Sequence, residues 1–237
     1  MPERTVEIRI LRWKPGAIEP ARFESFRVRA GEGATVLDAL ERIRREQDPG
    51  LVYRHSCHHS SCGTCACRVN GVERLACTAR LRDLGAGAVT LEPLRGFPVV
   101  ADLVVDARGF FADIDPAWDC LRPADPPAGA TAGAGGPIPV FQQLVRFEDC
   151  IECGACVSAC PVDKAQPGFM GPAALAAANA QRRKHPTDEP ALLALAGSER
   201  GEARCERALR CSQVCPTGVY PARHIMELRR RLRSTGP

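Results

Sequence analysis

The sequence predicts an α+β protein in which a strand-rich N-terminal part precedes an entirely helical C-terminal part. Three observations predict this class. Apolar and charged residues alternate near the N-terminus, apolar residues recur at helical spacing toward the C-terminus, and a Pro-, Gly- and Ala-rich stretch at 123–139 separates the two patterns. The predicted domains are 1–106 and 141–237, with 107–140 as the connecting segment.

The N-terminal domain is expected to begin with a strand at 6–10, where apolar residues alternate with charged ones. A second short strand is expected at Phe26–Val28. Thr35 is predicted to cap a helix, because apolar residues follow it at helical spacing. Those apolar residues are Val36, Leu37, Leu40 and Ile43.

A hairpin and several helices complete the expected elements. Asn70-Gly71 is a two-residue turn signal between strands at Ala66–Val69 and Glu73–Cys77. Short helices in the second domain are expected at Ala173–Arg183, Ala191–Ala196, Arg204–Leu209 and Arg223–Leu232.

Composition excludes several classes of function. A net charge of +4 and an aromatic content of 5% do not predict a nucleic-acid partner. No apolar run reaches the roughly 18 residues of a membrane span, and the first residues lack the apolar core of a signal peptide. The 13 cysteines are an odd number in a chain with no export signal, which predicts metal binding and not a disulfide framework.

The first cysteine group has the spacing of a plant-type 2Fe–2S ferredoxin. Cys57, Cys62 and Cys65 form C-x4-C-x2-C, and Cys77 follows across the predicted hairpin. Three thiolates would come from one tight loop and the fourth from the returning strand. Gly63 would let the loop backbone approach the sulfur atoms closely.

Two alternatives exist for this group. A structural zinc site prefers paired C-x2-C units, and only one such pair is present here. His58 and His59 could suggest a Rieske centre, but four cysteines already satisfy two irons, so these histidines are expected to be exposed on the loop. Cys67 and Cys120 are not needed as ligands, and both are expected to be inert thiols, Cys67 as a strand residue.

Two further cysteine runs have the pattern of a bacterial two-cluster ferredoxin. In such runs the fourth cysteine ligates the other cluster. The predicted 4Fe–4S ligands are Cys150, Cys153, Cys156 and Cys215, and the second site receives Cys160, Cys205 and Cys211. Ala208 stands where the second run would have its remaining cysteine, so the second site is predicted to hold a 3Fe–4S cluster.

Together these motifs predict an N-terminal plant-type 2Fe–2S ferredoxin (β-grasp) domain followed by an all-α bacterial-type ferredoxin domain. The whole pattern resembles the iron–sulfur subunit of succinate dehydrogenase and fumarate reductase. The resemblance covers nearly the full chain, including the interdomain stretch from Glu92 through Asp106 with Phe110-Phe111 and the Gly171-Pro172-Ala173 segment. Its cluster assignment matches the ligand sets above.

The resemblance implies an electron-transfer subunit of an oxidoreductase, without a substrate site of its own. An FAD-containing flavoprotein would exchange a hydride equivalent with succinate or fumarate. The implied electron order is flavin, 2Fe–2S, 4Fe–4S, 3Fe–4S and then a quinone in the membrane anchor, which would also hold any haem. The expected location is the cytoplasmic face of the cell membrane, where partner subunits would hold the chain.

Two departures bear on the quinone. The ubiquinone-linked branch of the family usually carries a Ser and Trp pair after the first Cys-Pro, where this chain has Val162–Gln166. Glu206 stands where that branch has a His. The Cys150–Cys156 run is more similar to the menaquinone-linked fumarate reductase branch or to its archaeal-type relatives.

Two alternative functions remain open from the sequence. The chain could serve a soluble, thiol-driven fumarate reductase or another flavoprotein dehydrogenase, and neighbouring genes would discriminate these. The second alternative is a non-redox, zinc-stabilised interaction protein, which would be colourless.

The basic C-terminal stretch is expected to be a solvated helix face. The sharper hypothesis is that this stretch contacts anionic lipid or a membrane subunit. Its arginines are Arg223, Arg229, Arg230, Arg231 and Arg233.

Overall fold

The computed structural model describes residues 3–115, 118, 147–162 and 168–235. The chain divides into two compact units, Met1–Gly109 with Ile151–Ala159, and Phe110–Cys150 with Cys160–Pro237. The first unit therefore includes a segment that the sequence prediction placed within 141–237. Cys120 and the stretch at 123–139 lie outside the described residues.

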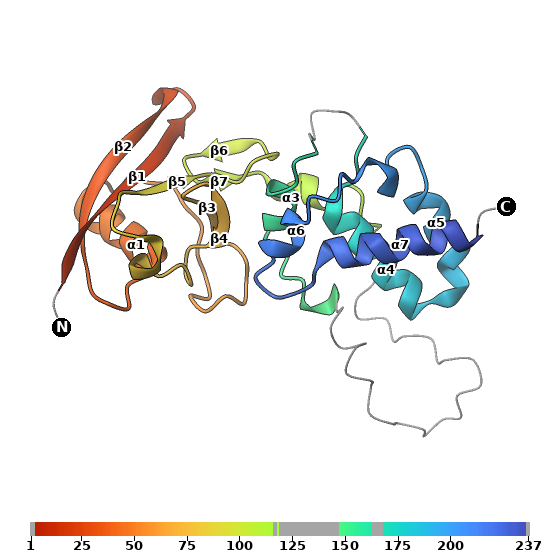
Figure 1. The fold of residues 1–237 in the computed structure, drawn as a ribbon. Coiled ribbons are helices and arrows are strands. Elements are labelled where there is room, and N and C mark those ends of the chain that lie inside the picture. The colour runs from red at the N-terminus through yellow and green to blue at the C-terminus, as the bar shows by residue number, and fades with distance from the viewer. Residues whose placement is uncertain (1–2, 116–117, 119–146, 163–167, 236–237) are drawn as a thin grey trace. The chain divides into compact units, whose positions relative to one another are not determined.

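A five-stranded sheet forms the framework of the first unit (Figure 1). Its order is β2-β1-β5-β3-β4, with β1 and β5 parallel and the other neighbouring strands antiparallel. The bounds are β1 Arg4–Lys14, β2 Ile18–Ala30, β3 Ala66–Val69, β4 Val72–Leu75 and β5 Val89–Glu92.

The alternating N-terminal pattern buries one face of this sheet against helix α1, Val36–Glu46. Ile8 and Ile10 of β1 are fully buried in that core together with Leu40 of the helix. Thr35 is the predicted N-cap, and it forms a capping box with Asp38 that satisfies backbone donors at the helix start.

The structure extends one strand prediction and corrects another. Phe26–Val28 belongs to the much longer strand β2, which pairs with β1 along nearly its whole length. The hairpin at Asn70-Gly71 is confirmed, but β4 ends at Leu75. Cys77 therefore lies in the turn after the strand, where the Thr78 and Ala79 amides both donate to the Leu75 carbonyl.

Smaller elements complete the first unit. Strands β6 and β7 form a separate two-stranded sheet, and α3 lies within the segment Ile151–Ala159. The bounds are β6 Val99–Ala101, β7 Val104–Val105, α3 Ala155–Ser158 and the 3-10 turn η1 Leu81–Leu84. A further 3-10 turn, η2, spans Ala107–Phe110.

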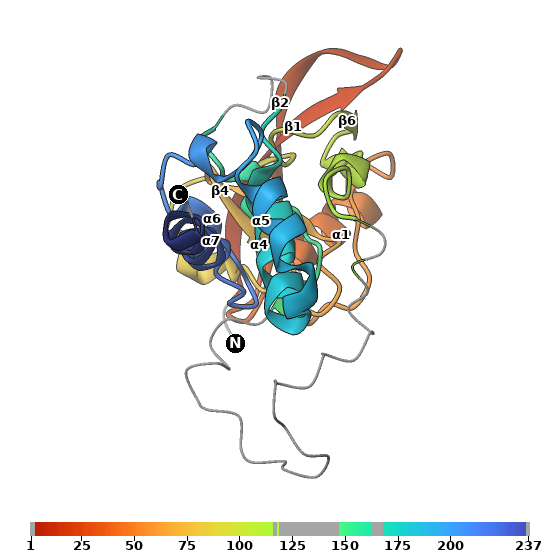
Figure 2. The same cartoon turned by 90° about the vertical axis from the view of Figure 1, so that its right-hand side faces the viewer.

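The second unit is helical in its described residues, and α4, α5 and α7 pack against one another (Figure 2). Leu175, Ala196 and Leu228 are fully buried in its core. The helices are α4 Gly171–Lys184, α5 Glu189–Ala196, α6 Arg210–Gln213 and α7 Pro221–Thr235. The 3-10 turns are η3 Phe147–Asp149, η4 Pro186–Asp188 and η5 Glu202–Arg204.

Three of the helix predictions for this unit are confirmed by α4, α5 and α7. The helix predicted at Arg204–Leu209 is wrong. That segment has only the 3-10 turn ending at Arg204, and both Arg207 and Leu209 have a positive φ, near 60°. An α-helix cannot pass through two left-handed residues, so the segment forms a loop before α6.

Among the residues that the structure describes, no helix has both the length and the apolar character needed to cross a membrane.

Candidate metal centres

The first four predicted ligands lie around one irregular loop and the turn after β4. Backbone amides of Ser61 and Cys62 donate to the Cys57 sulfur at 3.2 and 3.3 Å. The Thr64 hydroxyl lies 3.3 Å from the Cys62 sulfur, and this contact lowers the pKa of Cys62 to about 6. Amide and hydroxyl donors near sulfur favour a thiolate, which is the form that binds iron.

Cys65 and Cys77 form a second, more buried pair at this loop. The Ala76 amide donates to the Cys65 carbonyl at 3.2 Å, which brings the turn after β4 to the loop. Burial raises the pKa of the Cys65 thiol to about 12, with the backbone of Cys77 opposing the shift and the Cys77 side chain adding to it. A buried thiol of this kind becomes a thiolate when a cation coordinates it.

Gly63 allows the loop to pack tightly against the segment Ile151–Ala159. Its φ is +70°, and a Cβ atom here would lie 2.6 Å from the Ile151 carbonyl oxygen and 2.8 Å from the Cys153 Cβ. The expected role of Gly63, a close approach of the loop backbone to the cluster sulfur atoms, stays a prediction. The close contact that requires a glycine in this structure is between the Gly63 backbone and the segment Ile151–Ala159, which carries Cys153 and Cys156.

Cys67 lies on β3, as predicted, and is 2% exposed. Burial raises its pKa to about 12. His58 and His59 are exposed on the loop, as predicted.

The predicted ligands of the second site are divided between the two units. Cys153 and Cys156 lie in the first unit, on the segment that contains α3. Cys150 and Cys215 belong to the second unit. The convergence of these four thiols therefore remains a prediction from their spacing.

A buried polar contact anchors the α3 segment within the first unit. The Ser158 hydroxyl donates to the Glu73 carboxylate of β4 at 2.8 Å, and both residues are 5% exposed. The same hydroxyl accepts from the Arg95 amide at 2.8 Å. Sequence analysis did not identify this contact, because its partners are 85 and 63 residues apart and neither belongs to a motif.

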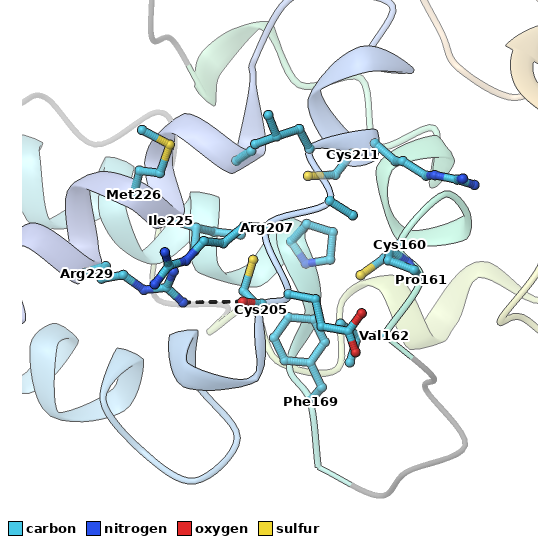
Figure 3. A pocket seen from close by; sticks show the side chains of 16 residues that line it. Cys160, Pro161, Val162, Phe169, Cys205, Arg207, Cys211, Ile225, Met226 and Arg229 are labelled. Atoms are coloured by element: carbon cyan, nitrogen blue, oxygen red, sulfur yellow. Dashed lines mark hydrogen bonds between the residues drawn. The ribbon is translucent and has the colours of Figure 1, made fainter.

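The third predicted site is a pocket within the second unit. Figure 3 shows Cys160, Cys205 and Cys211 around it. Its apolar wall includes Phe169 and Ile225. Burial, together with negative charge on the neighbouring Cys160 and Cys205, raises the pKa of Cys211 to about 11.

Ala208 lines the same pocket as the three cysteines. It stands between the two left-handed residues Arg207 and Leu209, which bend the chain around the pocket. The alanine that replaces the missing cysteine of the motif is therefore present at the site itself.

An arginine of α7 holds the Cys205 loop in place. Arg229 donates to the Cys205 carbonyl at 3.4 Å (Figure 3). It also donates to the Glu202 carbonyl at 2.9 Å and pairs with the Glu202 carboxylate. The expectation of a solvated arginine face is therefore wrong for Arg229, whose side chain is 13% exposed. Arg231 pairs with Glu189 of α5 and holds the pKa of that carboxyl at about 2.

One group of potential ligands lies outside all three predicted sites. Glu41, His55 and His58 bring ligand atoms within 4.8 Å of one another. Local sequence gave no signal for it, since Glu41 lies on α1 and far from the histidines along the chain.

Comparisons with known proteins identify iron–sulfur domains in both parts of the chain. A family model described as a 2Fe-2S iron-sulfur cluster binding domain matches residues 7–112, and one described as a 4Fe-4S dicluster domain matches 146–219. The fumarate reductase iron-sulfur subunit of Escherichia coli O157:H7 is 34% identical over 230 residues, covering 94% of this chain and 91% of that protein.

Two further relatives extend the comparison. The mitochondrial succinate dehydrogenase [ubiquinone] iron-sulfur subunit 1 of Oryza sativa is 33% identical over 226 residues, covering 91% of this chain and 78% of that one. A chain of the Mycobacterium smegmatis Sdh1 complex in the apo form shares the fold, with a TM-score of 0.80 at 24% identity, over 100% of this chain and 99% of that chain.

The fold and the cysteine loops define an iron–sulfur electron-transfer protein with a 2Fe–2S ferredoxin domain followed by a 4Fe–4S dicluster domain. More particularly, the chain belongs to the family of the iron–sulfur subunits of fumarate reductase and succinate dehydrogenase, which are oxidoreductases. The predicted fold class and family are thereby confirmed.

Proposed function

We propose that this chain carries single electrons between a flavoprotein that acts on succinate or fumarate and a quinone in a membrane anchor, through three iron–sulfur clusters. The family membership supports the electron-transfer role, and the printed names of the relatives include fumarate reductase and succinate dehydrogenase [ubiquinone]. The clusters, when bound, supply one-electron redox chemistry that amino-acid side chains lack.

The proposed ligands follow the sequence assignment. The 2Fe–2S cluster takes Cys57, Cys62, Cys65 and Cys77, and the 4Fe–4S cluster takes Cys150, Cys153, Cys156 and Cys215. The 3Fe–4S cluster takes Cys160, Cys205 and Cys211. The donor chemistry at the described loops fits these clusters, because backbone amides donate to the Cys57 sulfur and a glycine allows close packing of the loop.

The observation that carries the third assignment is the pocket lined by three cysteines and Ala208. Three thiolates leave one corner of a cube without a protein ligand, and the residue that would supply the fourth is an alanine. Phe169 and Ile225 give this pocket an apolar wall on one side, and exposure to solvent is one of the factors that set a cluster potential.

This chain's own residues position the ligands and insulate them. Arg229 fixes the loop that carries Cys205, and the Ser158–Glu73 contact fixes the segment that carries Cys153 and Cys156. The substrate chemistry and the FAD are assigned to the partner flavoprotein, and the quinone and any haem to the membrane subunits. The proposed location is the cytoplasmic face of the membrane, where these partners hold the chain.

Electron paramagnetic resonance of the anaerobically purified complex tests the proposal. Oxidised 2Fe–2S and 4Fe–4S clusters give no signal, whereas an oxidised 3Fe–4S cluster is paramagnetic. We expect a signal in the oxidised sample and additional signals after reduction. Silence in both states would overturn the electron-transfer proposal.

Ala208→Cys tests the third site. The new thiol should complete the ligand set, raise the iron content by about one atom per chain and remove the oxidised-state signal. Ala222→Cys is a matched control, because Ala222 lines the same pocket but stands outside the cysteine motif. Unchanged spectra and iron content in Ala208→Cys would show that the vacant corner is not at residue 208.

A further inference from the structure

Three side chains on the first unit have the arrangement of a metal site that is separate from the cysteine loops. Glu41 lies on α1, and His55 and His58 lie on the loop that carries Cys57. The His55 Nδ1 and His58 Nε2 atoms are 3.1 Å apart. The Glu41 Oε1 atom lies 3.8 Å from the first of these nitrogens and 3.5 Å from the second.

These three atoms form a triangle with sides of 3.1, 3.5 and 3.8 Å, which is close to the ligand spacing around a tetrahedral ion. Ligand atoms around tetrahedral Zn²⁺ are about 3.3 Å apart, because the metal–ligand bonds are about 2.0–2.1 Å long. A point equidistant from the three atoms lies about 2.0 Å from each of them. An ion could therefore bind all three atoms with little movement of the side chains.

A shared proton does not account for the position of the carboxylate. The distance between the histidine nitrogens suits a hydrogen bond, but both distances to Glu41 exceed the 2.7–3.2 Å that is usual for N–H···O. An ion at the centre of the triangle would instead contact all three atoms at bonding distance. Two imidazoles and one carboxylate are a common ligand set for Zn²⁺ and for other divalent first-row metals.

The surroundings orient the ligands and leave the site accessible. The Tyr53 ring, which is 9% exposed, stacks on the His55 ring with centroids 5.4 Å apart. The side chains of Glu41, His55 and His58 are 34, 35 and 45% exposed, so an ion can enter from solvent and a fourth position remains open to water. The neighbouring His59 hydrogen-bonds the Cys57 carbonyl and is not one of the three ligands.

We propose that Glu41, His55 and His58 bind a divalent transition-metal ion of the zinc class, with two imidazole nitrogens, one carboxylate oxygen and one open position. The bound ion connects α1 to the loop that carries Cys57. If Cys57 is a cluster ligand as proposed above, the nearby positive charge stabilises the reduced 2Fe–2S cluster and raises its reduction potential.

Calorimetric titration of the anaerobic, cluster-loaded protein with Zn²⁺ tests the site. We expect one Zn²⁺ per chain with an affinity at least tenfold higher than in Glu41→Gln, His55→Ala and His58→Ala. His59→Ala and Glu46→Gln are matched controls, an adjacent histidine and another acid on the same helix, and they should retain the wild-type affinity. Mg²⁺ should not compete. Iron content is measured before and after, so that binding to thiols vacated by iron is recognised.

X-ray absorption at the zinc edge of the wild-type protein gives a readout that does not depend on any variant. A shell of nitrogen and oxygen with imidazole scattering is expected, and a sulfur shell would overturn the proposal. Equal Zn²⁺ affinity in wild type and a His55→Ala/His58→Ala double variant would also overturn it. Because these readouts report zinc and not electron flow, their failure is distinguishable from failure of the proposed relay.

Redox titration with and without Zn²⁺, followed through the reduced 2Fe–2S signal, tests the effect on the cluster. The potential should rise with Zn²⁺ in wild type and remain constant in the double variant. An unchanged potential with zinc bound would overturn the proposed link to the cluster.

Discussion

At the scale of single residues, the loop around Cys57 combines donors for a thiolate with a glycine that has no room for a side chain. Two backbone amides donate to the Cys57 sulfur, which requires the chain to turn tightly between Cys57 and Cys62. Cysteine spacing predicted this loop because four thiolates must reach two irons. The spacing did not reveal that Gly63 faces Ile151 and Cys153, because those residues are distant in sequence.

Gly63→Ala should destabilise the first unit and reduce its iron content. The new Cβ would overlap the Ile151 carbonyl at 2.6 Å, and a φ of +70° adds conformational strain. Left-handed backbone alone costs an L-residue about 1–2 kcal/mol, so we expect a loss above ~2 kcal/mol. Chemical denaturation and iron analysis of the purified variant measure both effects.

Gly16→Ala is the matched control for this substitution. Gly16 has nearly the same positive φ, +71°, but a Cβ there would meet no atom within 4 Å. It should therefore lose about 1–2 kcal/mol from strain alone and keep its full iron content. Equal iron loss in both variants would show that backbone conformation, and not packing against the Ile151 segment, is what Gly63 provides.

At the scale of elements, α4 and α7 meet through a buried polar contact as well as through apolar side chains. Asn179 and His224 are both fully buried, with Asn179 Nδ2 3.0 Å from His224 Nδ1. Arg182 and Glu227 form an ion pair at 2.7 Å between the same two helices. Apolar spacing predicted the two helices, but it could not predict that polar residues join them.

Protonation of His224 should weaken this helix pair. Burial is the main cause that lowers the pKa of His224 to about 4, with Glu227 opposing the shift and Arg183 adding to it. In the unfolded chain the pKa is about 6.5, so the unfolded state binds more protons between pH 4 and 6.5, and stability falls as pH falls through that window. Between pH 7.5 and 5.5 we expect a loss of about 1 kcal/mol from this residue.

Denaturation at both pH values, in wild type and His224→Gln, measures this contribution. Glutamine is neutral throughout and can still accept from Asn179, so the variant should lose about 1 kcal/mol less than wild type over the interval. An identical pH dependence in the two proteins would mean that His224 is not held neutral in the fold.

The loop between η5 and α6 shows where element prediction from sequence fails. The composition of Arg204–Leu209 is compatible with a helix, because the segment contains no Gly or Pro and its charged residues are tolerated in helices. The chain instead bends at Arg207 and Leu209 so that Cys205, Ala208 and Cys211 line one pocket. The backbone conformation here therefore departs from the helix that local propensity allows, and it places these three residues at one pocket.

At the scale of the whole molecule, the compact units do not follow the order of the chain. The segment Ile151–Ala159 follows the proposed linker at 107–140 in sequence, yet it belongs to the first unit. The motifs predicted two ferredoxin-type domains correctly. The motifs could not predict that Ile151–Ala159 belongs to the first unit, because the contacts that fix this segment lie outside any motif. One such contact joins Ser158 and Glu73.

Ser158→Ala should therefore destabilise the N-terminal part of the chain, although residue 158 lies within the cysteine run at 150–160. The substitution leaves the buried Glu73 carboxylate without its hydroxyl donor and the Arg95 amide without its acceptor. Unsatisfied buried groups of this kind cost about 1–3 kcal/mol. Hydrogen exchange followed by mass spectrometry should show faster exchange in peptides from β3 and β4, with α4 and α7 peptides unchanged.

The exposed Ser25 provides a control with the same chemistry and a different environment. Its hydroxyl also donates to a glutamate, Glu7, at 2.8 Å, but on the solvent-exposed surface of the β1–β2 hairpin. Water can replace that bond, so Ser25→Ala should change stability by less than about 0.5 kcal/mol. If Ser158→Ala instead accelerated exchange equally in both units, the segment would be coupled to the whole fold, and its assignment to the first unit would carry no energetic meaning.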